Sequence, residues 1–464
     1  MRPLHFSLAL AGLLLLTPAS ISQNRPPNIV LIVADDLGWA DLSCYGPSLW
    51  QTPNLDRLAQ QGVRFTQAYA ASCVCSPTRA ALMTGRHPAR LHLTTFLPGR
   101  KDFPSQKLLQ PTIRQQLPPD ELTLAEVLKT RGYVSGHFGK WHLGDGPESN
   151  PLAQGFDVYQ GATGRYFNFK GPNLVARSDQ EYLTDRLTEE AERFLEQNRD
   201  RPFFLYLPHF AVHIPLQAKP DLLALYQQKA EKAPPELLRK NPVYAAVIHS
   251  LDESVGRILK KLDDLNLSQH TLVVFTSDNG GLSVKEGPNT PATSNAPLRA
   301  GKGYLYEGGI RVPLLIRWPG LVSPQRVEAT PVRSEDIFVT LVQAAGADLP
   351  KDRELDGISL LPLLRGKSEQ LARQHLYWHF PHYSNQGGQP CGAIRWNDWK
   401  LIEFFEDGRL ELYNLRQDIG EQHNLADLHP TLREQLHRQL VAWRQRLQVQ
   451  MPTPNPNYKP NRNQ

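Results

Sequence analysis

Cysteine is scarce in this chain, which has four in 464 residues. So few cysteines exclude a disulfide-rich framework, and none of them stands with histidine at the spacing of a zinc site. Long apolar runs are also lacking. The run at residues 8–16 is too short for a stable membrane anchor, and no other apolar run is long enough to span a bilayer. We therefore expect no stable membrane span.

The chain also lacks a strong charge of one sign. Its formal net charge is +5, with no basic run and no interleaving of basic and aromatic residues. This excludes the usual pattern of a nucleic-acid-binding protein, whereas a mild positive balance suits an anionic substrate. With 40% hydrophobic residues, the chain is long enough for a large core and more than one domain.

The first residues have the pattern of an export signal. Arg2 gives a charged start, the apolar run at residues 8–16 follows, and Ala19 and Ser20 are small residues suited to cleavage. We therefore expect residues 1–22 to be a signal peptide and the mature protein to be soluble and exported, either periplasmic or secreted.

A cysteine stands at the start of the stretch from Cys75 to Arg86. Pro77 suits the first turn of a helix, and Gly85 is a suitable stop. Cys75 is therefore predicted at a helix N-terminus, where unpaired N–H groups and the helix dipole favour an anion, with Arg79 one turn further on. This stretch alone leaves open a buried cysteine beside a capped helix.

Two buried strands are each followed by oxygen-bearing side chains. Residues 28–34 and 272–276 are apolar, β-branched runs typical of strands in a mainly parallel sheet. Adjacent carboxylates at the end of a buried strand repel each other, and a hard cation such as Ca²⁺ or Mg²⁺ relieves this. A solvated turn and an Asn-Gly hairpin are the alternatives. The side chains concerned are Asp35, Asp36, Asp278 and Asn279.

Basic side chains gather in three further segments. The first is Gly-Lys-Trp-His-Leu-Gly at residues 139–144, in which lysine and histidine alternate and so project to one side of an extended chain. The second follows a buried strand at residues 202–207, and the third is a glycine-rich segment at residues 298–313 whose spacing is not that of a P-loop. Ordinary surface positions are the alternative. The side chains are Lys140, His142, His213 and Lys302.

These motifs together resemble a known family. Cys-x-Pro-x-Arg at residues 75–79, followed by Thr-Gly-Arg, resembles the signature of the type I, formylglycine-dependent sulfatases of the alkaline phosphatase superfamily. Residues 139–144 and the Glu-Gly-Gly-x-Arg-Val-Pro segment at 307–313 are similar to two other segments of that family. The chain is arylsulfatase-like and N-acetylgalactosamine-sulfatase-like in its general pattern.

The resemblance implies a modified nucleophile and a metal ion. Cys75 would be oxidised to formylglycine by a formylglycine-generating or sulfatase-maturating enzyme, and the hydrate of this aldehyde would attack sulfur. A Ca²⁺ ion would bind the nucleophile and a sulfate oxygen, with Mg²⁺ as the less favoured ion. Its implied ligands are Asp35, Asp36, Asp278, Asn279 and the modified residue 75.

The resemblance also implies roles for the basic side chains. Lys140 and Lys302 would contact the sulfate, and Arg79 would mainly hold the hydrate. His213, with Lys302, would protonate the leaving alcohol. His142 would take the proton from the second hydroxyl of the hydrate, so that sulfate leaves and the aldehyde returns.

The expected activity is hydrolysis of sulfate monoesters, with O-sulfate groups on sulfated carbohydrates as substrates. His379, His382 and Arg395 could bind the sugar, and core packing is the alternative for each. Two other functions are consistent with the motifs: a phosphonate monoester or phosphodiester hydrolase of the same superfamily, and an unmatured protein that binds sulfated glycans.

The expected fold is α/β, an alkaline-phosphatase-like sandwich with a large, mostly parallel central sheet flanked by helices. It should occupy residues 23–369. Short aromatic strands beyond this point predict a small C-terminal α+β subdomain at residues 370–450, with an antiparallel sheet and a terminal helix. Residues 451–464, rich in proline and asparagine, are expected to be a disordered tail.

Overall fold

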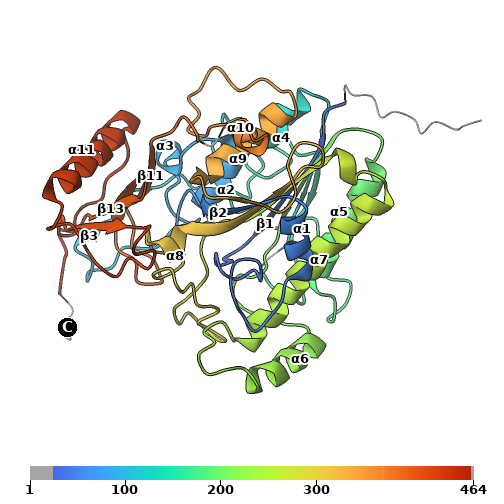
Figure 1. Ribbon diagram of the computed structural model, residues 1–464, viewed down its shortest axis with the longest axis horizontal. Coiled ribbons are helices and arrows are strands. Elements are labelled where there is room, and N and C mark those ends of the chain that lie inside the picture. The colour runs from blue at the N-terminus through green and yellow to red at the C-terminus, as the bar shows by residue number, and fades with distance from the viewer. Residues whose placement is uncertain (1–24, 163, 369, 461–464) are drawn as a thin grey trace, which may run out of the picture.

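The structure is a computed structural model that describes residues 25–162, 164–368 and 370–460. The predicted signal peptide at residues 1–22 lies outside the described residues. Two sheets organise the chain: a nine-stranded sheet in the larger part, and a four-stranded sheet beside it near the C-terminus (Figure 1). The predicted α/β fold class is confirmed. Within the described ranges, no helix has both the length and the apolar character needed to cross a bilayer.

The central sheet is mostly parallel. β1 (Asn28–Ala34) lies between β6 (Phe203–Pro208) and β7 (Thr271–Ser277), and both pairings are parallel. β8 (Arg311–Arg317) runs antiparallel to its two neighbours, β7 and β2 (Val63–Tyr69). The strand order is β10-β2-β8-β7-β1-β6-β4-β5, with β9 also paired to β2. The remaining strands are β4 (Val134–Phe138), β5 (Val158–Gln160), β9 (Arg326–Glu328) and β10 (Val332–Arg333).

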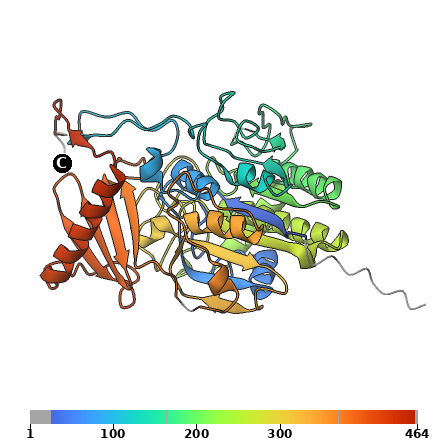
Figure 2. The ribbon, with the colours of Figure 1, turned by 90° about the horizontal axis from the view of Figure 1, so that it is seen from above.

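Helices cover both faces of this sheet, as β1 shows. Val30 and Ile32 join one apolar core, and Ile29 and Leu31 join the other, because successive side chains of a strand point to opposite faces. Figures 1 and 2 show the two helical layers. The first core contains α1 (Pro53–Gln60), α5 (Leu183–Gln197), α6 (Pro220–Glu231) and α7 (Pro242–Asp264), and η1 (Ser268–His270) follows α7. The second contains α2 (Cys75–Thr84), α3 (Pro88–Leu91), α4 (Leu124–Lys129), α9 (Ser334–Ala344) and α10 (Leu361–Leu364).

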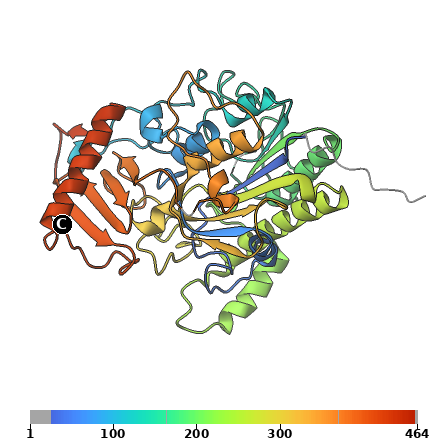
Figure 3. The same ribbon diagram turned by 45° about the horizontal axis from the view of Figure 1, so that its top comes forward.

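The second sheet is antiparallel, as predicted for the C-terminal part. One of its faces packs on α11 (Pro430–Leu447), the long helix that crosses it in Figures 2 and 3. The other face packs on Cys73, Val74 and the segment around α8 (Glu307–Ile310). This small sheet therefore lies directly against two segments that carry predicted catalytic residues. Its strands are β11 (His375–Phe380), β12 (Cys391–Trp396), β13 (Trp399–Phe404) and β14 (Leu410–Asn414).

The C-terminal tail is ordered where the structure describes it, so the expectation of disorder is wrong for residues 451–460. β15 (Thr453–Pro454) pairs antiparallel with β3 (Leu108–Leu109). The Asn455 side-chain amide donates to the carbonyl oxygen of Gln106 at 2.8 Å. A proline-rich composition does not show that a distant loop supplies a strand partner, and proline is compatible with an edge strand of this kind.

Candidate active site

The predicted oxygen ligands converge at one edge of the central sheet. Ala34 and Ser277 are register partners in the parallel strands β1 and β7, so the residues that follow them emerge side by side. The main-chain N–H of Asp36 donates to a carboxylate oxygen of Asp278 at 3.1 Å, and the Asn279 amide donates to Asp36 at 2.8 Å. All four side chains, including Asp35, are buried.

Cys75 is the first residue of α2, as the sequence predicted. The helix ends at Gly85, whose φ of 68° is the left-handed conformation that glycine adopts most readily. Cys75 is only 2% exposed. Burial raises the pKa of its thiol to about 11, although Lys140 and Lys302 oppose the shift. The unmodified thiol is therefore protonated at neutral pH and a poor nucleophile.

Two buried cations neutralise the carboxylates. Lys140 Nζ lies 2.6 Å from Asp35, and the Arg79 guanidinium contacts Asp278 at 2.7 and 2.8 Å. Arg79 also donates to the carbonyl oxygen of Lys140 at 2.8 Å. Burial disfavours the charge on Asp35, but the attraction of Lys140 and its neighbouring cations is stronger and holds the pKa of Asp35 well below its usual range. Arg79 thus holds the carboxylates and the Lys140 main chain together.

His142 is reached by a turn. β4 ends at Phe138, and His142 has a φ of 61°, so the extended alternation expected for Lys140 and His142 is wrong. Its Nε2 lies 2.7 Å from the carbonyl oxygen of Leu97. Because a carbonyl only accepts, Nε2 carries the proton, and the buried Nδ1 has no partner among the described residues. Burial, and then Lys140, lower the pKa of His142 to about 3.

Lys302 and His213 form the other basic pair. Lys302 Nζ lies 2.7 Å from Asp36 and 3.0 Å from Nε2 of His213. Burial disfavours the charge on Lys302, but Asp36 and other nearby groups outweigh it and raise the pKa of the ammonium. Partial burial, and then repulsion by Lys302, lower the pKa of His213, which is therefore the neutral member of the pair.

The oxygen cluster fits a hard cation. One carboxylate oxygen of Asp35 and the amide oxygen of Asn279 are buried and have no hydrogen-bond partner within the described part of the chain. Burial, followed by repulsion from Asp35, raises the pKa of Asp278 to about 7, so these carboxylates are crowded. Donor atoms of Asp35, Asp36, Cys75 and His213 lie within 4.8 Å of one another. Oxygen donors of this kind suit Ca²⁺ or Mg²⁺.

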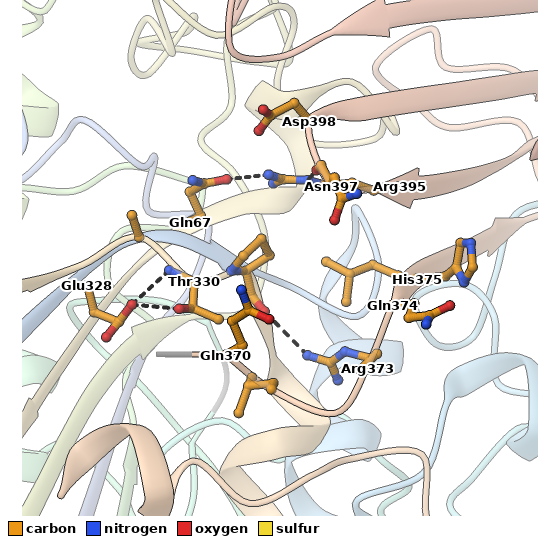
Figure 4. A pocket seen from close by; sticks show the side chains of 14 residues that line it. Gln67, Glu328, Thr330, Gln370, Arg373, Gln374, His375, Arg395, Asn397 and Asp398 are labelled. Atoms are coloured by element: carbon orange, nitrogen blue, oxygen red, sulfur yellow. Dashed lines mark hydrogen bonds between the residues drawn. The ribbon is translucent and has the colours of Figure 1, made fainter. Parts of the chain in front are cut away.

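The three residues suggested for sugar binding are buried and bonded to other parts of the chain. His379 and His382 are buried in the C-terminal sheet and the loop after it, where they contact the Gln450 carbonyl and the Thr94 hydroxyl. Arg395 is 2% exposed and donates to Gln67 and Tyr69. Figure 4 shows the Arg395–Gln67 contact in the wall of a cavity of about 500 Å³, whose lining includes none of the predicted catalytic residues. None of the hydrogen bonds that these three side chains make within the described part of the chain reaches a predicted catalytic side chain.

Sequence reasoning missed the groups that orient the two histidines. The carbonyl oxygen of Leu97 holds His142, and that of Ile214 faces Nδ1 of His213. The Tyr166 hydroxyl in turn donates to the main-chain carbonyl of His213 at 3.0 Å. Main-chain acceptors in irregular segments have no signature in the sequence, so no local pattern would have found them.

Comparison with known proteins identifies similar sequences over most of the chain. The profile described as Sulfatase matches residues 27–347, and one described as N-sulphoglucosamine sulphohydrolase, C-terminal, matches residues 300–446. A protein named Sulfatase from Formosa agariphila is 33% identical, covering 94% of this chain and 92% of that protein. Human arylsulfatase A is 36% identical, covering 89% and 86%, and human N-acetylgalactosamine-6-sulfatase is 38% identical, covering 74% and 67%.

Solved structures are similar as well. The crystal structure titled Ps i-CgsB in complex with k-i-k-neocarrahexaose has a TM-score of 0.78 at 32% identity, covering 90% of this chain and 93% of that chain. A phosphonate monoester hydrolase of Agrobacterium radiobacter has a TM-score of 0.67 at 22% identity, covering 92% and 99%, and is similar in fold.

Proposed function

The chain belongs to the sulfatase family, whose members are sulfuric ester hydrolases, and on this premise we propose that it hydrolyses O-sulfate monoesters on sulfated carbohydrates. The observation that carries the proposal is the cluster around Cys75. Two lysines and an arginine surround a buried helix N-terminus next to three carboxylates. A sulfate ester is an anion that repels nucleophiles, so concentrated positive charge is what its hydrolysis needs.

We assign a Ca²⁺ ion to the oxygen cluster at the ends of β1 and β7. The oxygens of Asp35 and Asn279 that have no hydrogen-bond partner among the described residues support this assignment. When bound, the ion supplies a positive charge that polarises a sulfate oxygen and acidifies a nearby hydroxyl. Lys140, Lys302 and Arg79 keep the surrounding carboxylates paired. The ligands that we propose are Asp35, Asp36, Asp278, Asn279 and the modified residue 75.

The nucleophile is assigned to position 75 after oxidation of Cys75 to formylglycine. The high pKa of the buried thiol supports a precursor role, because a protonated thiol would attack an anionic ester poorly. Every residue of α2 is buried. A formylglycine-generating or sulfatase-maturating enzyme could therefore reach Cys75 only before the chain folds.

The two histidine environments support different proton transfers. His213 and Lys302 together can protonate the departing sugar oxygen, because the Lys302 ammonium donates to Nε2 of His213 and the pair holds a proton at this point. Nδ1 of His142 has no partner in the described part of the chain, so its lone pair is free to accept a proton in the step that frees sulfate. One acid and one base on separate segments are what a two-step transfer requires.

Sulfated carbohydrate is the substrate class that the comparisons favour. One similar protein is named N-acetylgalactosamine-6-sulfatase, and one similar structure is titled as a complex with k-i-k-neocarrahexaose. The pattern of residues 1–22 supports export to the periplasm or the medium, where such polymers are accessible.

A substrate panel tests the proposal. The protein, produced with a maturating enzyme, is assayed on sulfated mono- and oligosaccharides, an aryl sulfate, an aryl phosphonate and a phosphodiester. We expect release of sulfate from sugars and from the aryl sulfate. Intact-mass analysis of the Cys75 peptide should show a loss of about 18 Da, which marks the aldehyde.

Two outcomes would overturn the proposal. Greater efficiency on the phosphodiester or phosphonate would assign the chain to that hydrolase class. Tight binding of sulfated glycans without turnover, together with an unmodified Cys75 peptide from every host, would indicate a glycan-binding protein.

A further inference from the structure

The segment that carries Lys302 is tightly bonded to the catalytic centre. We call residues 299–309 the Lys302 turn. The main-chain N–H of Lys302 donates to the carbonyl oxygen of Gly281 at 3.1 Å, and that of Gly303 donates to Cys73 at 2.9 Å. The turn is also bonded within itself, because the N–H of Gly308 donates to the carbonyl oxygen of Arg299 at 2.9 Å, so its two ends are coupled. What anchors its far end therefore contributes to the position of the Lys302 ammonium.

The far end of the turn is anchored by a buried carboxylate. The Glu307 side chain is 0% exposed, and it accepts from the Tyr69 hydroxyl at 2.7 Å and from Lys400 Nζ at 3.0 Å. The main-chain N–H of Glu307 donates to the Glu421 carboxylate at 2.6 Å. The Arg311 guanidinium lies 3.3 Å from the Glu307 carboxylate. Lys400 belongs to β13, and Glu421 follows β14, so both come from the C-terminal sheet region.

Two buried carboxylates share one buried ammonium at this anchor. One fully buried ammonium, Lys400, lies 3.0 Å from Glu307 and 2.8 Å from Glu421. Burial opposes the charge of Glu307, but Lys400 and other cations lower its pKa to about 2; for Glu421 burial prevails and raises the pKa to about 7. Loss of the ammonium would leave two carboxylates buried together, which is strongly unfavourable.

A second set of contacts joins the same two parts of the chain. Arg299, at the start of the Lys302 turn, donates to the carbonyl oxygen of Glu421 at 2.8 Å and contacts the Tyr413 hydroxyl at 3.0 Å. Its guanidinium lies over the Tyr306 ring, 3.9 Å from the centroid. The Tyr306 hydroxyl donates to Glu411 at 2.7 Å. Both ends of the turn are thus held by the C-terminal sheet region.

We propose that Lys400 and Glu421 are positioning residues for sulfate ester hydrolysis, acting by anchoring the Lys302 turn. The C-terminal sheet then does more than cover the catalytic part of the chain, because it sets the position of a proton donor. This inference rests on the proposed function. It also gives a reason for a buried ion network at this interface, since an apolar contact of similar size would not fix the direction of the main chain at Glu307.

A double-mutant cycle tests the inference. Lys400→Met keeps the aliphatic stem and removes the ammonium, and we expect a fall in kcat of about 10- to 100-fold, the size of effect that a misplaced catalytic group produces. If Lys400 acts through Lys302, then Lys302→Ala/Lys400→Met should be no slower than Lys302→Ala. Each variant is assayed at a temperature at which circular dichroism shows it folded. Multiplicative losses in the double variant would overturn the inference.

Restoring the charge balance provides a second measurement. Glu421→Gln keeps an acceptor for the Glu307 N–H and removes one negative charge, so Lys400→Met/Glu421→Gln should recover part of the lost kcat. If Lys400→Met fails to fold, Glu421→Gln alone should lower kcat several-fold and show the same non-additivity with Lys302→Ala. The inference would be contradicted if Lys400→Met/Glu421→Gln recovered no kcat. It would also be contradicted if the losses of kcat in Glu421→Gln and Lys302→Ala were additive in free energy.

A matched control separates this effect from the loss of any lysine ion pair. Lys219 lies 2.8 Å from Asp185 and 3.4 Å from Glu253, so it too stands between two carboxylates. Lys219→Met should leave kcat unchanged. If the wild-type chain cleaves no sulfate ester, the proposed function fails; if it does and Lys400→Met is fully active, only the positioning role fails.

Discussion

The ammonium of Lys302 lies 3.0 Å from Nε2 of His213. An ammonium can only donate, so Nε2 is the acceptor, and the ring proton is on Nδ1, which faces the Ile214 carbonyl oxygen. Of the two side chains, Lys302 is therefore the one that holds a transferable proton at this point of the site.

The loss of kcat in Lys302→Met should depend on the leaving group of the substrate. Sugar oxygens are poor leaving groups and need a proton, so we expect kcat on a sugar sulfate to fall about 10²- to 10⁴-fold. A nitrophenolate leaves without protonation, so nitrophenyl sulfate should be affected much less. Initial rates on both substrates give the comparison, with the exposed Lys285→Met as the control. Equal losses on both substrates would limit Lys302 to sulfate binding.

Calcium should stabilise the folded chain through the oxygen cluster. At a concentration about 100 times Kd, a ligand that binds only the folded state contributes about 2.7 kcal/mol. Differential scanning fluorimetry should therefore show a rise in Tm with Ca²⁺ that EGTA reverses.

Two variants test whether calcium binds at this oxygen cluster. Asp36→Asn should remove the rise in Tm, and Asp264→Asn, which changes an exposed acid paired with Lys260, should keep it. A calcium-induced rise that survives Asp36→Asn would place the ion elsewhere.

Cys75→Ser should abolish turnover if maturation is specific for cysteine. A serine hydroxyl at this position would form an ester that water must hydrolyse, whereas an aldehyde hydrate can release sulfate internally. Release of the alcohol without sulfate in a single turnover would mark a trapped serine ester, and steady-state sulfate release would mark continued turnover. Retained steady-state activity would mean that the maturating enzyme also accepts serine, which the mass of the peptide would show.

His137 should make the fold sensitive to acid. It is fully buried among the rings of Trp141, Phe156, Tyr159 and Tyr206, and neither ring nitrogen finds a partner in the described part of the chain. Burial lowers its pKa to about 3. An unfolded histidine titrates near pH 6.5, so between these two pH values only the unfolded chain takes up the proton. Stability should therefore fall as the pH falls below about 6.5.

His137→Phe should remove this contribution. We expect the slope of unfolding free energy against pH to decrease by about 1.4 kcal/mol per pH unit, and stability at pH 7 to rise by about 1–3 kcal/mol as the unpaired nitrogens are lost. Urea unfolding at pH 5, 6 and 7 measures both. His423→Phe, at a histidine whose side chain is 81% exposed, is the control. An unchanged slope in His137→Phe would contradict the assignment.

Much of the site could be predicted because its residues follow buried strands. Asp35 and Asp278 each come directly after an apolar strand, and parallel strands end at the same edge of a sheet. The helix that starts at Cys75 also has local signals, with Gly85 as its stop. Local patterns of this kind predict where a side chain leaves a strand or begins a helix. The topology of the sheet then brings the ends of neighbouring strands together.

The positions of the residues suggested for sugar binding could not be predicted, for a different reason. His379, His382 and Arg395 have side chains that suit a sugar, but side-chain type does not reveal which face of an antiparallel strand is covered. In the structure all three are buried and bonded to other parts of the chain. The contacts of the tail at residues 451–460 could not be predicted either, because its strand partner lies more than 300 residues earlier in the chain.

The sequence by itself determined the family, the α/β sheet and the set of charged residues, because each has a local motif or periodicity. Only the tertiary structure decided how those charges are paired. The contacts of Lys302 with His213, of His142 with Leu97 and of Lys400 with Glu307 join segments distant in the chain. Their geometry depends on packing and burial, which no single segment contains.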